Sequence, residues 1–348
     1  MFNRPFKNSC SRYLLLFEDI TSIAWLLILL GFIVGTLSGF FGVGGAFIMT
    51  PALNILGFPI VYAIGTDLAL MLGTSILATV RHFKFGNVDI RLGIYMLLGT
   101  TVGVWLGKSL VFILLASGEA ETVIRLIYIL LLFTVSSFMV YDYILFISRP
   151  YFKKHKPETE THSTPLSRRL RQLKIKPMVE LPASGIKQIS VWIPIGVGVL
   201  TGFLAAFLGV GGGFIRMPAL IYAMGIPTTI AVGTDLFEII FSSAIGTFLY
   251  AIEGKVYLVA AMVLFIGASI GVQVGSYATQ HVRGMRVRLY FAITLFFAGV
   301  SVALKQLSVW RDIPLLSTIA AYLIVGVATI MMLIIATKLI IGLITHRV

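Results

Sequence analysis

The chain has 348 residues, of which 58% are apolar and only 12% charged, and its mean hydropathy is +0.99. A soluble globular protein carries about a quarter charged residues, so this composition excludes a water-soluble globular chain. In a soluble protein the net charge of +13 would suggest a nucleic-acid partner. Here the excess lies in short segments between apolar runs, where the positive-inside rule and anionic lipid explain it better. The single cysteine, Cys10, excludes an intramolecular disulfide and a multi-cysteine metal site.

Apolar runs long enough to cross about 30 Å of hydrocarbon as helices predict an all-α, multi-pass protein of a plasma or inner membrane. The first run continues to Phe41, too far for a signal peptide, so we interpret it as an uncleaved span. Nine spans are predicted, at 20–41, 60–83, 91–115, 122–147, 190–208, 228–251, 256–280, 286–304 and 314–343.

Two shorter apolar segments, 46–57 and 213–225, follow the first span and the fifth. Each would reach roughly 18 Å as a helix, at 1.5 Å per residue, which is too short to cross. We interpret both as half-helices or re-entrant segments, which a membrane tolerates only where they are buried in protein or line a cavity.

A basic linker at 148–189 separates the two halves of the chain. Its ten basic residues against three acidic ones predict a cytoplasmic segment. A solvated loop that sets orientation is the simpler interpretation, and a regulatory or lipid-binding role is the alternative. With the linker inside, the turn at 116–121 falls outside and the turn at 81–91 falls inside. Lys255 also falls inside, but Arg283, Arg286 and Arg288 fall outside, against the charge rule.

An internal repeat is the strongest signal in the sequence. The pattern F-x-G-V-G-G-x-F-I-x-x-P-A-L runs from Phe40 to Leu53 and again from Phe207 to Leu220. The pattern A-x-G-T-D-L follows in both halves, ending at Leu68 and Leu236. The repeat divides the chain into a first transmembrane repeat (1–147), the linker (148–189), a second repeat (190–305) and an extra C-terminal helix (306–348).

Each repeat is predicted to hold about four transmembrane helices and one half-helix. An even number of crossings predicts repeats that point the same way across the membrane. If the short segments cross as well, the repeats are inverted. In transporters built from repeats, the substrate site lies near mid-membrane between them, at broken helices.

The glycine runs are candidate substrate-binding turns: Gly42, Gly44 and Gly45 in the first half, and Gly209, Gly211, Gly212 and Gly213 in the second. Glycine permits left-handed backbone and close approach of a ligand. The free amides and positive dipole end of the half-helix that follows attract anions. The alternative is that these glycines only let helices pack closely.

Two Thr-Asp pairs, Thr66-Asp67 and Thr234-Asp235, lie in apolar sequence and are predicted to open long helices. Threonine and aspartate are good N-caps, and Asp235 with Glu238 resembles a capping box. The alternative is proton coupling by Asp67, Asp235 or Glu238, because an intramembrane carboxylate is costly and often functional. The threonines are then candidate substrate contacts.

Arg216 follows the second glycine run, where the first half has Met49. An arginine this deep must face a cavity or a partner. Its guanidinium fits a sulfonate, sulfite or carboxylate, and pairing with Asp235 or Glu238 is the alternative. Gln273 is a weaker candidate. Glycines spaced by four, at 99, 103 and 107 and at 267, 271 and 275, predict close helix packing.

The duplicated G-V-G-G-x-F-I-x-x-P-A-L and the G-T-D that follows resemble the sulfite exporter TauE/SafE family, also called the 4-toluene sulfonate uptake permease family. The likeness covers about 25–305 without the linker. It implies duplicated membrane proteins that move sulfite, sulfonates, sulfoacetate and similar anions, and it implies a site at Gly42–Gly45, Gly209–Gly213 and the two Thr-Asp pairs. The long linker and the ninth span depart from the family.

We therefore expect a secondary transporter of a small sulfur-containing or organic anion, driven by a proton or sodium gradient or by the membrane potential. The alternatives are a passive anion channel and, less favoured, a receptor or scaffold that uses the linker. No enzyme, cofactor, metal site or nucleic-acid partner is expected. The partners are the anion and the lipid bilayer.

Overall fold

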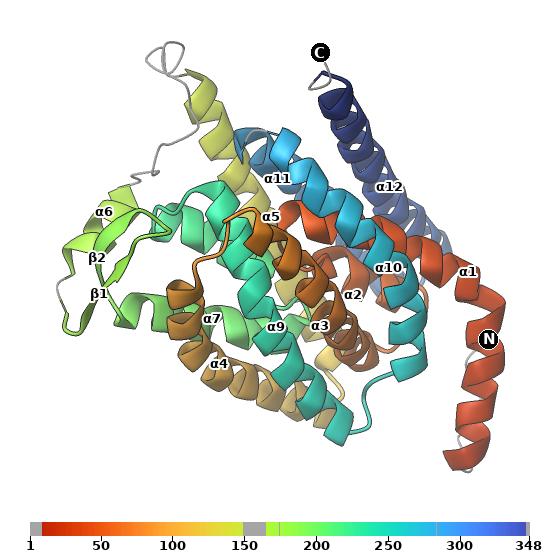
Figure 1. Ribbon diagram of the computed structural model, residues 1–348. Coiled ribbons are helices and arrows are strands. Elements are labelled where there is room, and N and C mark those ends of the chain that lie inside the picture. The colour runs from red at the N-terminus through yellow and green to blue at the C-terminus, as the bar shows by residue number, and fades with distance from the viewer. Residues whose placement is uncertain (1–8, 149–164, 174, 283, 346–348) are drawn as a thin grey trace.

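The computed structural model describes residues 9–148, 165–173, 175–282 and 284–345, and it is built almost wholly of helices (Figure 1). The first half holds α1 (Ser9–Phe41), α2 (Ala46–Ile55), α3 (Ile60–Lys84), α4 (Ile90–Ala116) and α5 (Ala120–Ser148). The second half holds α7 (Trp192–Leu208), α8 (Gly213–Pro218) with the π-helical turn η2 (Ala219–Ala223), α9 (Thr228–Ile252), α10 (Leu258–Ala278), η3 (Thr279–His281), α11 (Gly284–Arg311) and α12 (Pro314–Thr345).

Eight helices of the described chain are long and apolar enough to cross a membrane. The prediction of an all-α, multi-pass membrane protein is thereby confirmed. The predicted span 190–208 forms α7, but that helix has only 17 residues and stands among the shorter apolar helices. The segments predicted as half-helices form α2 and α8 with η2. Their apolar side chains are buried in protein, which is the condition for short helices at membrane depth.

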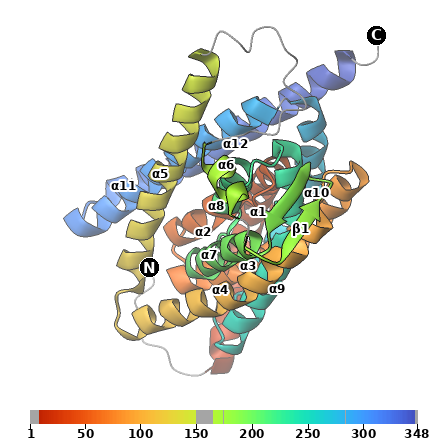
Figure 2. The same cartoon turned by 90° about the vertical axis from the view of Figure 1, so that its left-hand side faces the viewer.

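The linker is only partly the solvated loop that we predicted. Residues 149–164 lie outside the described residues, but the rest contains α6 (Pro165–Gln172) and an antiparallel hairpin of β1 (Met178–Leu181) and β2 (Ile186–Ser190). The hairpin lies beside α7 in Figures 1 and 2. Its turn is hydrogen-bonded to the start of α4. The Ser184 hydroxyl donates to Asp89 Oδ2 at 2.6 Å, and the Ser184 amide donates to the same oxygen at 3.2 Å.

The glycine rows pack helices of one half against helices of the other. A Cβ on Gly103 or Gly107 in α4 would overlap a backbone oxygen of α7, and a Cβ on Gly267 or Gly275 in α10 would overlap one of α1. The prediction of close packing is confirmed. The partner of each row is the first helix of the opposite half, so the two halves are interlocked.

Two pairs of equivalent helices, α3 with α9 and α5 with α11, run antiparallel. Gly65 near the start of α3 packs on Lys255 beyond the end of α9, while Gly233 near the start of α9 packs on Asn87 beyond the end of α3. In the other pair, Arg125 early in α5 bonds Gln306 late in α11.

The predicted position of Lys255 is wrong, because Lys255 and the 81–91 turn lie at opposite ends of the α3–α9 pair. Arg288 bonds Thr228 at the start of α9, and the start of α9 lies at the same end of the helix pair as the 81–91 turn. Arg288 is therefore on the side predicted to be cytoplasmic, and the predicted conflict with the charge rule disappears. The physical reason is that α2 returns the chain to the end of the molecule at which the membrane-spanning part of α1 begins, so that α3 runs in the same direction as α1. Both α1 and α3 run parallel to α10: Gly31, Gly35 and Gly39 pack in turn on Leu264, Ala268 and Val272, and Gly73 packs on Phe265 while Arg81 further along α3 bonds Gln273.

Candidate functional site

The two glycine turns meet at the centre of the molecule. Gly44 and Gly211 adopt φ of 72° and 59°, a left-handed conformation that glycine reaches without strain. A Cβ on Gly213 would lie 2.7 Å from Val43 Cα, so the backbone of one turn touches that of the other. Both turns therefore pack tightly. Whether they also bind substrate stays a prediction.

Each turn also packs on the third helix of the opposite half. A Cβ on Gly42 would lie 2.8 Å from Val232 Cα in α9, and one on Gly209 would lie 2.8 Å from Ile64 Cα in α3. These contacts place each turn against a residue two positions before the threonine of a Thr-Asp pair in the other half. The sequence motifs that resemble each other are thus brought together in space.

The Arg216 cluster lies beside this junction and is completely buried. Arg216 Nη1 forms ion pairs with Asp235, at 3.0 Å from Oδ1, and with Glu238. Arg216 Nε donates to the Thr201 hydroxyl at 3.0 Å, and the Thr100 hydroxyl donates to Glu238. The alternative prediction, an ion pair of Arg216 with Asp235 or Glu238, describes the observed state. With all three groups ionised, two carboxylates share one cation.

Asp67 occupies the matching place in the first half and has no cation of the described chain in an ion pair with it. Its carboxyl is fully buried. The Thr50 hydroxyl lies 2.7 Å from Asp67 Oδ2 and 3.3 Å from the carbonyl oxygen of Gly209, which belongs to the other glycine turn. Tyr128 also contacts Thr50. The two Thr-Asp pairs thus have unlike surroundings.

The predicted helix caps are wrong. Helix α3 begins after Pro59 and α9 after Pro227, so both Thr-Asp pairs lie inside their helices rather than at the first turn. A proline before the helix is the stronger start signal here, because it cannot continue a helix toward its own N-terminal side. Each threonine instead binds the residue that precedes a helix of the other half: Tyr257 N, before α10, donates to Thr66 at 3.0 Å, and Asp89 N, before α4, donates to Thr234 at 2.9 Å.

The remaining weak candidate, Gln273, lies away from the Arg216 cluster and accepts a hydrogen bond from Arg81 Nε at 2.5 Å. Sequence reasoning missed Thr50, Thr100, Thr201 and Tyr128. Thr50 had a usable signal, because the two variable positions of the duplicated F-I-x-x-P motif hold Met49-Thr50 in one half and Arg216-Met217 in the other. The single polar residue of each half stands there.

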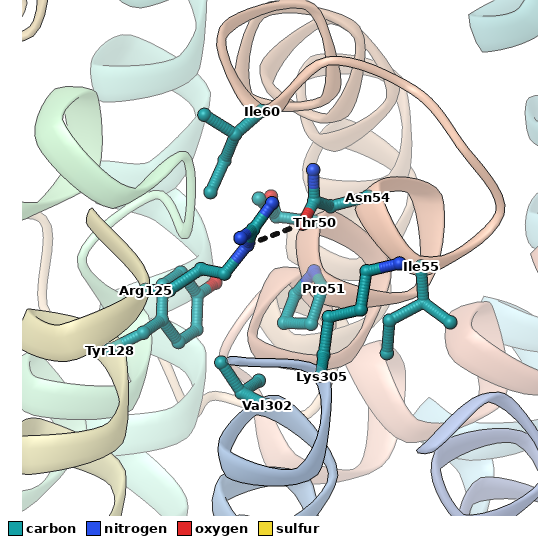
Figure 3. Close-up of a pocket in the computed structure, with 9 residues that line it drawn as sticks. All are labelled: Thr50, Pro51, Asn54, Ile55, Ile60, Arg125, Tyr128, Val302 and Lys305. Carbon is teal, nitrogen blue, oxygen red and sulfur yellow. Dashed lines mark hydrogen bonds between the residues drawn. The ribbon is translucent and has the colours of Figure 1, made fainter. Parts of the chain in front are cut away.

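Two small cavities lie toward opposite ends of α3. The first, here called the Arg125 pocket, is a small hollow that is partly open to its surroundings, and its empty space counted out through the mouth is about 270 Å³ (Figure 3). Its inner wall includes Thr50 and Tyr128, and its lining residues are Thr50, Pro51, Asn54, Ile55, Ile60, Arg125, Tyr128, Val302 and Lys305. The second encloses about 260 Å³ at the end of α3, between His82 and Thr228. Neither cavity is lined by Arg216.

Comparisons with known proteins agree with this picture. The model of the family described as sulfite exporter TauE/SafE matches residues 27–302. The chain is 27% identical to YunE of Bacillus subtilis, over 79% of this chain and 95% of the relative, and 26% identical to YjnA of the same organism, over 79% and 97%. It is 27% identical to MJ0441 of Methanocaldococcus jannaschii, over 78% and 94%. All three are named probable membrane transporter proteins. No solved structure matches the chain significantly.

Proposed function

Since the chain belongs to the sulfite exporter TauE/SafE family and is a membrane transporter, we propose that it is a secondary transporter of a small sulfur-containing or organic anion. Sulfite, a sulfonate and sulfoacetate are the substrates that the family description and the site chemistry favour. The observation that carries the proposal is a fully buried arginine, Arg216, beside the junction of two glycine turns.

Arg216 offers the guanidinium fork that fits sulfonate, sulfite and carboxylate groups. In the structure the carboxylates of Asp235 and Glu238 both bind this guanidinium, so a substrate anion must compete with one of them. A proton on one of these carboxyls weakens its bond to the guanidinium and frees a donor for the anion. Binding of the proton and of the anion therefore favour each other, as linkage requires.

Asp67 supports proton coupling by a second route. The single hydrogen of the Thr50 hydroxyl cannot serve Asp67 and the Gly209 carbonyl at once. When Asp67 carries a proton, it donates to Thr50, and Thr50 then donates to Gly209. A proton on Asp67 would thus bond the two glycine-turn regions together, and its loss would loosen them.

The antiparallel course of α3 with α9 and of α5 with α11 supports inverted repeats. In inverted-repeat transporters one repeat rocks against the other around a central site, which opens first to one side and then to the other. The buried Arg216 cluster, with no lining role in either cavity, favours such a carrier over a passive channel.

The test is flux in proteoliposomes that contain the full chain. Labelled sulfite, sulfoacetate and thiosulfate are supplied with a pH gradient, with a sodium gradient or with neither. We expect saturable uptake of at least one anion, faster with the pH gradient. Absence of flux for all three anions, with folded protein, would contradict the proposal, and single-channel steps in a planar bilayer would establish the passive channel instead.

A further inference from the structure

The Arg125 pocket contains two cations from different halves of the protein. Arg125 reaches it from α5 and Lys305 from α11, with α2 forming the facing wall (Figure 3). We propose that this pocket is a second anion-binding site, a vestibule in which the anion waits between Arg125 and Lys305 before it reaches the centre. The proposal rests on the proposed function for the nature of its ligand, a small anion.

The repeat shows that this pair of cations is a departure from symmetry. The sequence Ile-Arg-Leu at 124–126 matches Val-Arg-Leu at 287–289, so Arg125 is equivalent to Arg288. The same offset makes Lys305 equivalent to Asp142. Arg288 Nη1 lies 3.7 Å from Asp142 Oδ2, so the arginine of α11 faces a carboxylate of α5, whereas at the equivalent place the arginine of α5 faces a lysine of α11.

The neighbouring charged groups leave the pocket with an excess of positive charge. Arg125 forms an ion pair with Glu121, whose side chain is 44% exposed, and it also donates to Asn54 Oδ1 at 3.0 Å. Lys305 donates to the Ser317 hydroxyl at 2.8 Å, and the charges that act on it are those of Arg125 and Glu121. Two cations against one carboxylate at the rim favour an anion between them.

The pocket leads to the candidate site. Thr50 forms part of its inner wall, and the same hydroxyl contacts Asp67 and the carbonyl of Gly209. The cavity at the other end of α3 has no lysine or arginine among the described residues that line it. An anion is therefore attracted more strongly to the Arg125 pocket, because Arg288, which bonds the lining residue Thr228 of the other cavity, has the carboxylate of Asp142 3.7 Å away.

The test labels the pocket directly. Ile55, a lining residue, is replaced by cysteine in the Cys10→Ser background of the full chain, purified in lipid-free detergent. We expect an anionic methanethiosulfonate to react about tenfold faster than a cationic one, because a positively lined cleft concentrates anions. Sulfoacetate and sulfate should slow the reaction by occupying the pocket. Added phosphatidylglycerol tests whether an anionic lipid headgroup occupies the pocket instead.

The decisive variant is Lys305→Asp, which recreates the Arg288–Asp142 pair. It should abolish the preference for the anionic reagent and the protection by sulfoacetate. Lys305→Met should give an intermediate result if the aspartate variant does not fold. Arg311→Asp makes the same charge change on an exposed residue of α11 outside the pocket, and it should leave the preference in place.

An unchanged preference in both Lys305 variants would overturn the proposal, as would equal loss in Arg311→Asp or protection by phosphatidylglycerol alone. The outcome is separable from that of the flux assay. Saturable flux, with labelling of the Ile55→Cys variant that no anion slows, rejects the vestibule and keeps the transporter. Labelling that the anions do slow, without any flux, keeps the anion site and rejects the transporter.

Discussion

Arg216 and Asp67 show how two differences in sequence between the halves alter the chemistry around an aspartate that both halves share. The second half has Arg216 and Glu238 where the first has Met49 and Leu70. Asp235 consequently lies in an ion-paired cluster, and its equivalent, Asp67, has only Thr50 as a hydrogen-bond partner that the structure records. The two repeats therefore present different charged groups at the candidate site.

Replacing Arg216 by methionine, the residue of the first half, should leave Asp235 and Glu238 buried without a cation. We expect a loss of at least about 3 kcal/mol in stability, visible as a lower melting temperature in detergent, and no anion flux. The triple variant Arg216→Met, Asp235→Asn, Glu238→Leu should recover most of the stability, because no charge is left unpaired, but none of the flux. Flux in the triple variant would contradict the role of Arg216.

Asp67→Asn keeps an oxygen for the Thr50 hydroxyl but cannot exchange a proton. We expect a folded protein whose anion exchange persists and whose acceleration by a pH gradient is smaller than in the native chain, since a residue that cannot bind a proton removes one of the two proposed coupling routes and leaves the route through Asp235 and Glu238. Flux with and without the gradient measures this. Asp312→Asn, in the turn before α12, is the control and should respond to the gradient like the native chain.

At the scale of elements, the glycine rows determine which helices pack together. Glycine on a helix face lets a neighbouring backbone approach closely, and the rows of α4 and α10 meet backbone oxygens of α7 and α1. Gly198 and Gly196, both in α7, separate this packing effect from helix propensity. A Cβ on Gly198 would overlap the Met96 carbonyl oxygen, whereas nothing lies near a Cβ on Gly196.

Gly198→Ala should therefore destabilise the protein by about 1–3 kcal/mol, as overpacking does. Gly196→Ala should stabilise it by roughly 0.5 kcal/mol, because alanine loses less backbone entropy in a helix. Melting temperatures of the two variants in one detergent measure the difference. A similar melting temperature for both would show that α4 and α7 separate easily and that the interlocked packing is weak.

At the scale of the whole molecule, the antiparallel α3–α9 pair fixes the relation between the repeats. Lys84 and Ile252 are equivalent by the repeat offset, yet they end helices that run in opposite directions. Single cysteines at these positions, in the Cys10→Ser background, should be labelled from opposite sides of the membrane. Glu119→Cys should be labelled from the same side as Ile252→Cys, because Lys108 late in α4 forms an ion pair with Glu253 beyond α9.

A membrane-impermeant thiol reagent applied to sealed vesicles measures this. Repeats that point the same way would give labelling of Lys84→Cys and Ile252→Cys from one side. The measurement thus distinguishes the two orientations independently of any transport assay.

Much of the architecture could be predicted because its signals are local. Run length and apolarity predict the helices, and the duplicated motif predicts that two broken helices recur at equivalent places. The same motif predicts where the candidate site lies. The prediction of helix caps at the Thr-Asp pairs is wrong because the helices begin earlier, directly after Pro59 and Pro227. The predicted side of Lys255 is wrong because that prediction counts only the long spans and not α2.

Run length, apolarity and the duplicated motif are enough to identify a multi-pass helical protein with two similar halves, and to predict an arginine and carboxylates at membrane depth near paired glycine turns. The folded chain is needed to see that α1 packs on α10 and α7 on α4, that Arg216 meets both Asp235 and Glu238, and that Thr50 links Asp67 to the other turn. The physical reason is that the length and apolarity of a helix depend on one segment alone. A row of glycines shows that another helix can approach closely, but it does not specify which helix. That choice depends on shape and charge across residues more than a hundred positions apart.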